Sequence, residues 1–255
     1  MDRTDARAIE RLCRPVREPL LSFDDAVRNL HAFGPRCRFI KTLPPSAAVL
    51  DVGAGDGSLQ VFRHWPDPPR PDLLMFAWAG IKGASFDLYD ASEVGSWPEH
   101  PPSFGGRRFD AIIAANFVEH IDDPIAFVEW SIARLAPGGR LYLEWPRPES
   151  ALLPTTADLA ALGLPIMTGN YFDDATHRAT IPDAGAVRSA IAGAGLTLRE
   201  NGIVSVSFVD QELAIHAARA RDTVNLTLAY WSMTGWCQYL VAEAGHSSSR
   251  SGAVA

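Results

Sequence analysis

Short apolar runs, bounded by glycine, proline and charged residues, recur along most of the chain. Runs of this kind are typical of strands that are buried on both faces of a parallel sheet. They predict strands at residues 47–52, 73–79, 86–89, 109–115, 140–145, 196–204 and 236–242.

Apolar residues at helical spacing lie between several of these runs. The clearest helix, at residues 124–135, follows Asp122-Asp123, which supply a cap, and stops before Pro137. Further helices are predicted at residues 184–194 and 210–231. Strands that alternate with helices indicate βαβ units, so we expect an α/β fold with a mostly parallel sheet flanked by helices.

Residues 5–42 show two helical stripes, and Pro44-Pro45 ends this arm. The stripes are Ile9, Leu12 and Val16, followed by Phe23, Val27, Leu30 and Phe33. Such an arm can be a helical cap that packs on the core or a lid over a ligand site, and both interpretations stay open. The predicted organisation is an N-terminal helical cap at 1–45, a main domain at 46–244 with a helical insertion at about 207–232, and a disordered tail at 245–255.

The composition is that of an ordinary globular protein. Of 255 residues, 47% are hydrophobic, which is enough for one α/β domain with appendages. The net charge is −7, and the best local basic cluster is the pair Arg107-Arg108. Because nucleic-acid binding usually needs a basic face, we expect no nucleic-acid partner.

Cysteine usage and hydropathy bear on the compartment. Cys13, Cys37 and Cys237 are scattered and form no C-x-x-C pair, which argues against a disulfide framework and fits a reducing cytosol. The first residues carry mixed charge, so we expect no secretory signal, and no apolar run approaches the ~18 residues of a membrane span. These features predict a cytoplasmic protein without a membrane partner.

The strongest chemical signal is the glycine-rich turn from Asp51 to Gly57, at the end of the first predicted strand. Glycine lets the backbone turn sharply and approach a ligand, and ligands of open α/β sheets bind at the carboxyl ends of strands. The Gly-x-Gly-x-Gly spacing differs from the Gly-x-Gly-x-x-Gly of dinucleotide-binding proteins, which disfavours a nicotinamide-dependent oxidoreductase. A tight connection without a ligand is the simplest alternative.

Further segments follow this turn in an order that resembles the class I S-adenosylmethionine-dependent methyltransferases. They are Asp90-Ala91, then Phe109-Asp110-Ala111-Ile112-Ile113 leading into Asn116-Phe117-Val118-Glu119-His120, and Leu135-Ala136-Pro137-Gly138-Gly139. The resemblance covers roughly residues 46–204. It implies a Rossmann-like methyltransferase fold with a mostly parallel seven-stranded sheet, an N-terminal helical cap and a helical insertion before the last strand.

The resemblance also implies how the turn would bind the cofactor. The backbone of Gly53, Ala54 and Gly55 would face the methionine part of S-adenosylmethionine. Asp51 would anchor the turn or reach the ammonium group of the cofactor.

Other matching positions would surround the rest of the cofactor. Asp90, followed by Ala91, would lie at the adenine, and Asn116 would line the cavity near the methyl donor. Family members usually hold the ribose with Asp or Glu at the end of the second strand, where this chain has Ala79-Gly80. Either the ribose is held differently, with Lys82 or Asp87 as candidates, or the cofactor binds weakly.

A second group, Glu119-His120 with His177, contains residue types that bind divalent cations. It resembles the metal site of ubiquinone-pathway O-methyltransferases and small-RNA 2′-O-methyltransferases, which combine Glu-x-x-Glu-His with a later His. Asn116 replaces the first Glu, which leaves a weaker site for an ion such as Mg²⁺. Without a metal, Glu119 and His120 would have local structural roles, and His177 would be a general base or a surface histidine.

We therefore predict a methyltransferase that uses S-adenosylmethionine and acts on a small-molecule acceptor. O-methylation of a hydroxyl on a sugar, phenol or natural product is favoured, with His177, Glu119 and His120 as catalytic residues. Trp145 and Tyr171 are candidates to line the acceptor pocket, and the apolar stripe of residues 210–231 would cover that pocket or form a homodimer contact. The rival interpretation is a catalytically silent methyltransferase-like binding or scaffold protein.

Overall fold

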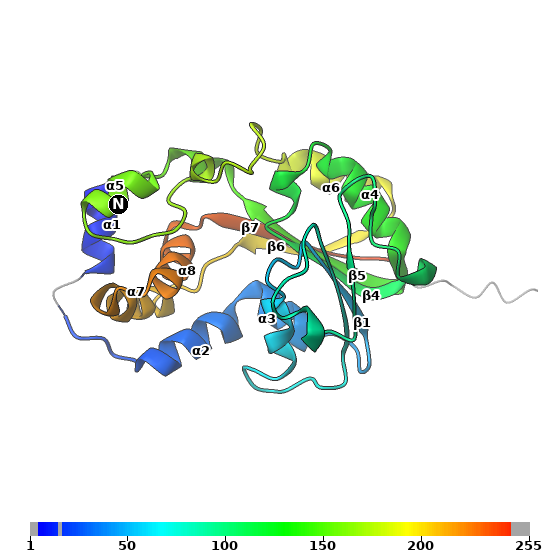
Figure 1. The fold of residues 1–255 in the computed structure, drawn as a ribbon, viewed down its shortest axis with the longest axis horizontal. Coiled ribbons are helices and arrows are strands. Elements are labelled where there is room, and N and C mark those ends of the chain that lie inside the picture. Colours follow the sequence, from blue (N-terminus) through cyan, green and yellow to red (C-terminus); the bar gives the residue numbers. More distant parts are fainter. Residues whose placement is uncertain (1–4, 15–16, 246–255) are drawn as a thin grey trace, which may run out of the picture.

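The computed structural model describes residues 5–14 and 17–245. At its centre lies a seven-stranded sheet with the order β3-β2-β1-β4-β5-β7-β6 (Figure 1). β7 runs antiparallel to β5 and β6, and the other neighbouring strands pair in parallel, as predicted. The strands are β1 (Ala48–Val52), β2 (Leu74–Ala79), β3 (Ala91–Val94), β4 (Phe109–Ala115), β5 (Leu135–Pro146), β6 (Thr197–Ile203) and β7 (Cys237–Glu243).

The predicted strand at residues 86–89 is wrong. Phe86–Leu88 forms a short 3₁₀ helix, η2, and the third strand is β3, which begins at Ala91. Phe86 is buried in the core, whereas β3 lies at the edge of the sheet and most of its side chains are exposed. Because an exposed edge strand has no apolar run, the hydrophobic pattern pointed to the buried segment just before it, around Phe86, instead.

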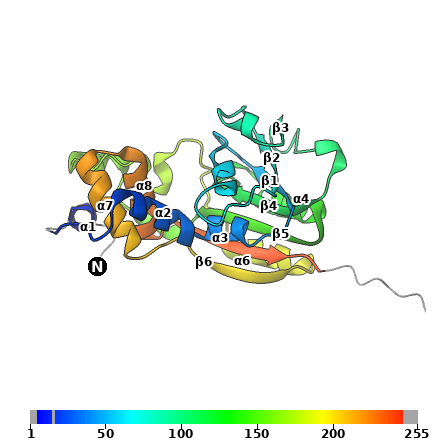
Figure 2. The same ribbon diagram turned by 90° about the horizontal axis from the view of Figure 1, so that it is seen from below.

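Helices cover both faces of the sheet (Figures 1 and 2). α4 and α6 pack on one face, and α3 packs with the 3₁₀ helix η1 on the other. The predicted helix 124–135 is confirmed as α4, whose N-cap residue Asp123 accepts a hydrogen bond from the Ala126 amide. The helices are α1 (Ala6–Cys13), α2 (Phe23–Phe33), α3 (Pro35–Lys41), α4 (Pro124–Arg134), α5 (Thr156–Ala161), α6 (Ala184–Gly193), α7 (Val209–Ala220) and α8 (Thr223–Thr234), and the 3₁₀ helices are η1 (Ser58–Arg63), η2, η3 (Phe104–Gly106), η4 (Val118–His120), η5 (Pro148–Leu152) and η6 (Tyr171–Asp173).

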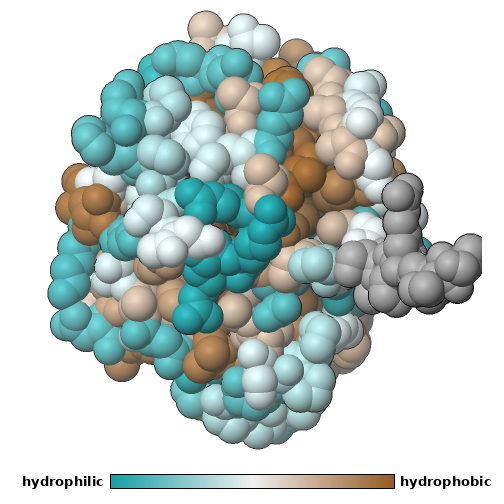
Figure 3. Space-filling model, turned by 90° about the vertical axis from the view of Figure 1, so that its right-hand side faces the viewer, coloured by the Kyte–Doolittle hydropathy of each residue, from teal (hydrophilic) through white to brown (hydrophobic). Residues whose placement is uncertain are grey.

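Helices from three parts of the chain form a lobe beside the carboxyl ends of the parallel strands (Figure 2). The lobe contains α1, α2, α5, α7 and α8, which share one apolar core with members such as Ile9, Leu30, Leu159, Leu213 and Leu226. The predicted N-terminal cap and the predicted insertion therefore pack against each other. The end of the molecule opposite the lobe has a mixture of hydrophilic and apolar residues on its surface (Figure 3).

The predicted single helix at 210–231 is wrong, because the chain turns back after Ala220. Arg221 adopts a left-handed conformation with φ 54°, and the Asp222 side chain caps the following helix. α7 and α8 then pack as a helical hairpin that buries Leu213 and Ala217 of the predicted stripe inside the chain. These two residues are unavailable for a contact between copies, and a homodimer stays a prediction.

The N-terminal arm is held on the lobe by a buried carboxylate. Glu212 on α7 accepts hydrogen bonds from Arg17 and from the backbone amides of Leu20 and Leu21. Of the second predicted stripe, Leu30 is buried, but Phe33 is 60% exposed. Val16, and the predicted tail from residue 246 onward, lie outside the described residues. Within residues 5–14 and 17–245, no helix combines the length and the apolar character needed to span a bilayer.

Candidate functional site

The glycine turn lies at the carboxyl end of β1, next to the ends of β2 and β4. Gly53, Gly55 and Gly57 all have positive φ, and the amides of Gly53 and Ala54 donate to the Trp78 carbonyl at 2.9 and 3.1 Å. A Cβ on Gly53 would lie 2.7 Å from the Phe117 ring, whereas a Cβ on Gly55 would meet nothing closer than 3.9 Å. The backbone at Gly55 therefore borders open space in which a ligand can approach.

Gly83, which sequence reasoning missed, packs directly against the backbone of this turn. A Cβ at Gly83 would lie 2.3 Å from the Gly55 carbonyl oxygen, so only glycine lets the two segments pack this closely. The Ser85 amide donates to the Asp56 carbonyl at 2.8 Å and fixes the contact. The only signal in the sequence was a glycine in the short connection after β2.

Asp51 is a buried carboxylate near the end of β1. It accepts a 2.6 Å hydrogen bond from the Tyr89 hydroxyl. Burial raises the pKa of Asp51 to about 6, although the hydrogen bond from Tyr89 and the charge of Arg36 act in the opposite direction. This arrangement favours the role of turn anchor among the two roles that the resemblance implies.

Substituting Asp51→Asn is expected to stabilise the protein without ligand at pH 7. The folded state binds the Asp51 proton more tightly than the unfolded state, so wild type loses stability as pH rises from 3.8 to about 6. The variant escapes this loss and keeps an oxygen for Tyr89, and the gain should approach about 3 kcal/mol above pH 6. Urea unfolding of both proteins between pH 4 and pH 8 measures it, and a difference that does not grow with pH would contradict this.

Asp90 and Ala91 do not follow the third strand, where they were expected, but lie at its start, and their role at the adenine stays a prediction. Asp90 precedes β3, and its carboxylate accepts from the Met75 amide at 2.7 Å and from Arg63 at 3.2 Å. Ala91 pairs with Phe76 near the start of β2. Because the third strand begins after Asp90, these residues lie at the amino-terminal edge of the sheet, away from Gly53.

The end of β2 has no carboxylate, as the sequence indicated. Ala79 is followed by Gly80 and by Ile81, which is 82% exposed. Lys82 and Asp87, the candidates for holding the ribose, form a 2.7 Å ion pair with each other on the surface. Their role toward a ribose stays a prediction.

Asn116 lies directly after β4, beside the glycine turn. Its backbone is left-handed with φ 53°, and its amide donates to the Glu144 carbonyl at 2.8 Å. Few non-glycine residues adopt a left-handed backbone, and those that do are concentrated at functional sites. Its side-chain oxygen lies 3.3 Å from the Cys237 thiol, so Asn116 connects the ends of β4, β5 and β7.

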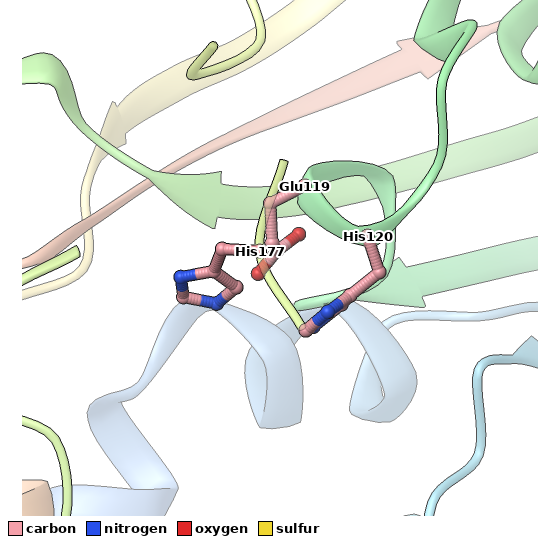
Figure 4. Close-up of side chains that lie close together, drawn as sticks. All are labelled: Glu119, His120 and His177. Carbon is pink, nitrogen blue, oxygen red and sulfur yellow. The ribbon is translucent and has the colours of Figure 1, made fainter. Parts of the chain in front are cut away.

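Glu119, His120 and His177 are brought together as the sequence predicted. Their ligand atoms all lie within 4.8 Å of one another. Figure 4 shows the Glu119 carboxylate between the two imidazole rings, which come from η4 and from the loop after η6. The ring centroids of the two histidines are 4.9 Å apart.

Neighbouring groups fix how the two imidazoles are oriented. His177 Nδ1 lies 2.6 Å from the Tyr171 carbonyl, which can only accept, so Nδ1 carries the hydrogen. The Thr176 hydroxyl donates to Asp174 and is left to accept from His120 Nδ1 at 2.9 Å. When the rings are neutral, both Nε2 atoms therefore keep a lone pair, as ligating histidines do.

Glu119 is a buried carboxyl group in the middle of this cluster. It is 1% exposed, and among the residues that the structure describes neither of its carboxylate oxygens has a hydrogen-bond partner. Burial raises the pKa of Glu119 to about 8, and the negative charges of Glu144 and Asp174 add to the effect. Burial, followed by the proximity of His177, lowers the pKa of His120 and so favours its neutral form. A buried acid without partners beside two imidazoles has the chemistry of a cation site.

A cavity of about 180 Å³ opens where the helical lobe meets the sheet. Its wall includes Asn116 at one side and the ion pair of Arg36 and Glu144. Sequence reasoning missed this pair because its members are 108 positions apart. The predicted pocket residues Trp145 and Tyr171 do not line this cavity: Trp145 is a core residue that donates to Pro182, and Tyr171 stacks on His177. Trp231 of α8 is an aromatic residue that does line the cavity.

Comparison with known proteins places these features in a family. The chain matches the model of the methyltransferase domain over residues 23–201. It is 29% identical over 130 residues to the ubiquinone biosynthesis O-methyltransferase of Xanthomonas campestris pv. campestris (strain B100), a match that covers 47% of this chain and 53% of that protein. The chain thus spans about half the length of the curated relatives it matches.

Solved structures share the fold at low sequence identity. A chain from the complex between the Haloferax volcanii Trm112 methyltransferase activator and a candidate methyltransferase has a TM-score of 0.52 and 18% identity, with 88% of this chain and 94% of that chain covered. A candidate methyltransferase of Bacillus halodurans C-125 has a TM-score of 0.51 and 15% identity, with 82% and 97% covered. The predicted methyltransferase fold is confirmed, and the family model covers well over half of the residues. The chain therefore belongs to the methyltransferase domain family, within the class I S-adenosylmethionine-dependent methyltransferases.

Proposed function

We propose that this protein transfers a methyl group from S-adenosylmethionine to a hydroxyl oxygen of a small-molecule acceptor. The observation that carries the proposal is the shared edge of β1 and β4, where Asn116 follows β4 next to the glycine turn and lines the cavity between the helical lobe and the sheet. When bound, the cofactor supplies a methyl group on a positively charged sulfur. The task of the chain is to hold the acceptor oxygen in line with that methyl group and to exclude water.

The residues present fit the cofactor. The positive φ at Gly53 and Gly55, and the open space beside Gly55, leave room for the methionine part. Asp51 holds the turn through Tyr89, and Asn116 joins the turn to the cavity. The bare end of β2 leaves the ribose to be held by groups other than a carboxylate at that position.

The residues also fit a divalent cation. Glu119, His120 and His177 would hold it, since the buried carboxylate has no hydrogen-bond partner in the described part of the chain and both imidazoles are oriented by neighbouring groups. A cation there would lower the pKa of a nearby acceptor hydroxyl. The half-length match to an O-methyltransferase supports oxygen as the acceptor atom.

Calorimetric titration with S-adenosylmethionine, followed by mass spectrometry of methylated products, tests the proposal. We expect binding and a mass gain of one methyl group on a hydroxyl compound. No heat of binding at high micromolar cofactor would contradict it. That result would favour a catalytically silent binding or scaffold protein. The absence of a carboxylate at the end of β2, where family members usually hold the ribose, is the reason to consider this alternative.

A further inference from the structure

The cavity between the helical lobe and the sheet has the size of one aromatic ring with small substituents. Its volume of about 180 Å³ compares with the roughly 150 Å³ of an engineered protein cavity that stays dry and binds benzene. Most of the wall is apolar, with contributions from both the helical lobe and the sheet. The apolar members are Leu30, Phe62, Val204, Val206, Leu228 and Trp231.

The two charged residues of this wall, Arg36 and Glu144, are paired with each other. Arg36, from the first turn of α3, donates to Glu144 on β5, and the Tyr142 hydroxyl donates to the other oxygen of Glu144. His31 also lines the cavity, but burial and the charge of Arg36 lower its pKa to about 4, so it is neutral at physiological pH. Arg36 is then the cation among the lining residues and Glu144 the anion.

This pair can donate and accept at the same time. A guanidinium has five N–H donors, and the carboxylate oxygens of Glu144 keep lone pairs beyond the two donors named above. Arg36 keeps about a third of its side-chain surface accessible. A hydroxyl group satisfies both partners, because it donates its hydrogen to Glu144 and accepts from Arg36. A carboxylate ligand would instead meet the charge of Glu144.

We propose that the cavity binds a single-ring phenol and that Arg36 and Glu144 bind the hydroxyl group that becomes methylated. The inference rests on the proposed function, because Asn116 joins this cavity to the glycine turn. The phenol oxygen attacks the methyl carbon, the carbon–sulfur bond breaks, and its electron pair stays on sulfur to give S-adenosylhomocysteine. The hydroxyl proton passes to the Glu144 carboxylate and then to water, while Arg36 stabilises the charge that develops on the oxygen.

The test uses three probes with the same ring. The full chain, saturated with S-adenosylhomocysteine, is titrated with 4-methylphenol, 4-methylanisole and 4-methylbenzoate. We expect the phenol to bind at least about 10-fold more tightly than the other two. With S-adenosylmethionine, 4-methylphenol should be converted to 4-methylanisole.

Variants assign the roles of the two residues. Glu144→Gln keeps the shape of the side chain and should lower kcat/KM for the phenol by about 10²-fold or more, with affinity for S-adenosylhomocysteine unchanged. Arg36→Met should weaken phenol binding, and Arg36→Lys should restore part of it. Arg38→Met is the matched control, since Arg38 lies on the same helix, is about half exposed and pairs with the surface residue Glu200.

The outcomes separate the two proposals. If S-adenosylhomocysteine does not bind wild type, the proposed function fails, and this inference fails with it. If it binds but 4-methylbenzoate is preferred, or Glu144→Gln retains full kcat/KM with the phenol, the inference fails alone. Circular dichroism and S-adenosylhomocysteine affinity show that each variant is folded.

Discussion

Gly53→Ala is expected to abolish cofactor binding. The backbone at Gly53 has φ 74°, a conformation that costs alanine about 1–2 kcal/mol. The new Cβ would also lie 2.7–3.0 Å from three atoms of Phe117. The Phe117 ring packs edge-on against Trp78 and Phe127, so it cannot move aside freely. Together these effects should lower the free energy of unfolding by about 2–4 kcal/mol and S-adenosylmethionine affinity by about 100-fold or more.

Two further alanine substitutions serve as controls for Gly53→Ala. Gly105→Ala introduces the same backbone strain at φ 64° without a collision, and Gly193→Ala lies in α6, where a Cβ meets nothing within 4 Å. Both should leave cofactor affinity unchanged, and Gly193→Ala should be neutral or slightly stabilising. Calorimetry and urea unfolding measure both quantities. A Gly53→Ala protein that binds cofactor as wild type does would remove the turn from the site.

Glu119→Gln is expected to have opposite effects on stability and on cation binding. The substitution removes a buried acid whose oxygens have no hydrogen-bond partner within residues 5–14 and 17–245, so the metal-free protein should become more stable. It also removes the carboxylate from the proposed cation site, so Mn²⁺ affinity should fall by about 10–100-fold or more. Methyl transfer should fall with it.

Electron paramagnetic resonance of Mn²⁺ in the presence of the protein measures bound and free ion directly. Wild type should lose methyl transfer in EDTA and recover it with Mg²⁺ or Mn²⁺. Glu149→Gln, a change at an exposed residue that pairs with Arg147, is the matched control. If wild type is indifferent to EDTA and Glu119→Gln binds Mn²⁺ as wild type does, the cation site does not exist. Proton removal from the acceptor would then rest on Glu144 alone.

Local patterns were enough to predict most of the sheet. β1, β2 and β4 are buried between layers, so their apolar runs mark them in the sequence. α4 is marked by its capping aspartate and its first-turn proline. The glycine turn is also local, because positive φ at alternate positions requires glycine whatever packs above it.

The errors arose where the surroundings decide the local structure. Phe86 and Leu88 resemble a strand by composition. In the structure, however, Phe86 is a buried core residue of a short 3₁₀ helix, and the exposed β3 follows it. Asp90 was consequently expected after the third strand, whereas it precedes β3. The reversal at Arg221 interrupts the apolar stripe, and α7 and α8 then pack against each other as a hairpin.

By itself, the sequence determined the fold class, the glycine turn and the Glu119-His120 pair, since each depends on residues that are close in the chain. Only the tertiary structure decided that the N-terminal arm and the insertion form one lobe, and that Arg36 and Glu144 meet in a cavity beside Asn116. Contacts between distant segments depend on how apolar surfaces of separate elements are buried together. No periodicity or spacing along the chain records that choice.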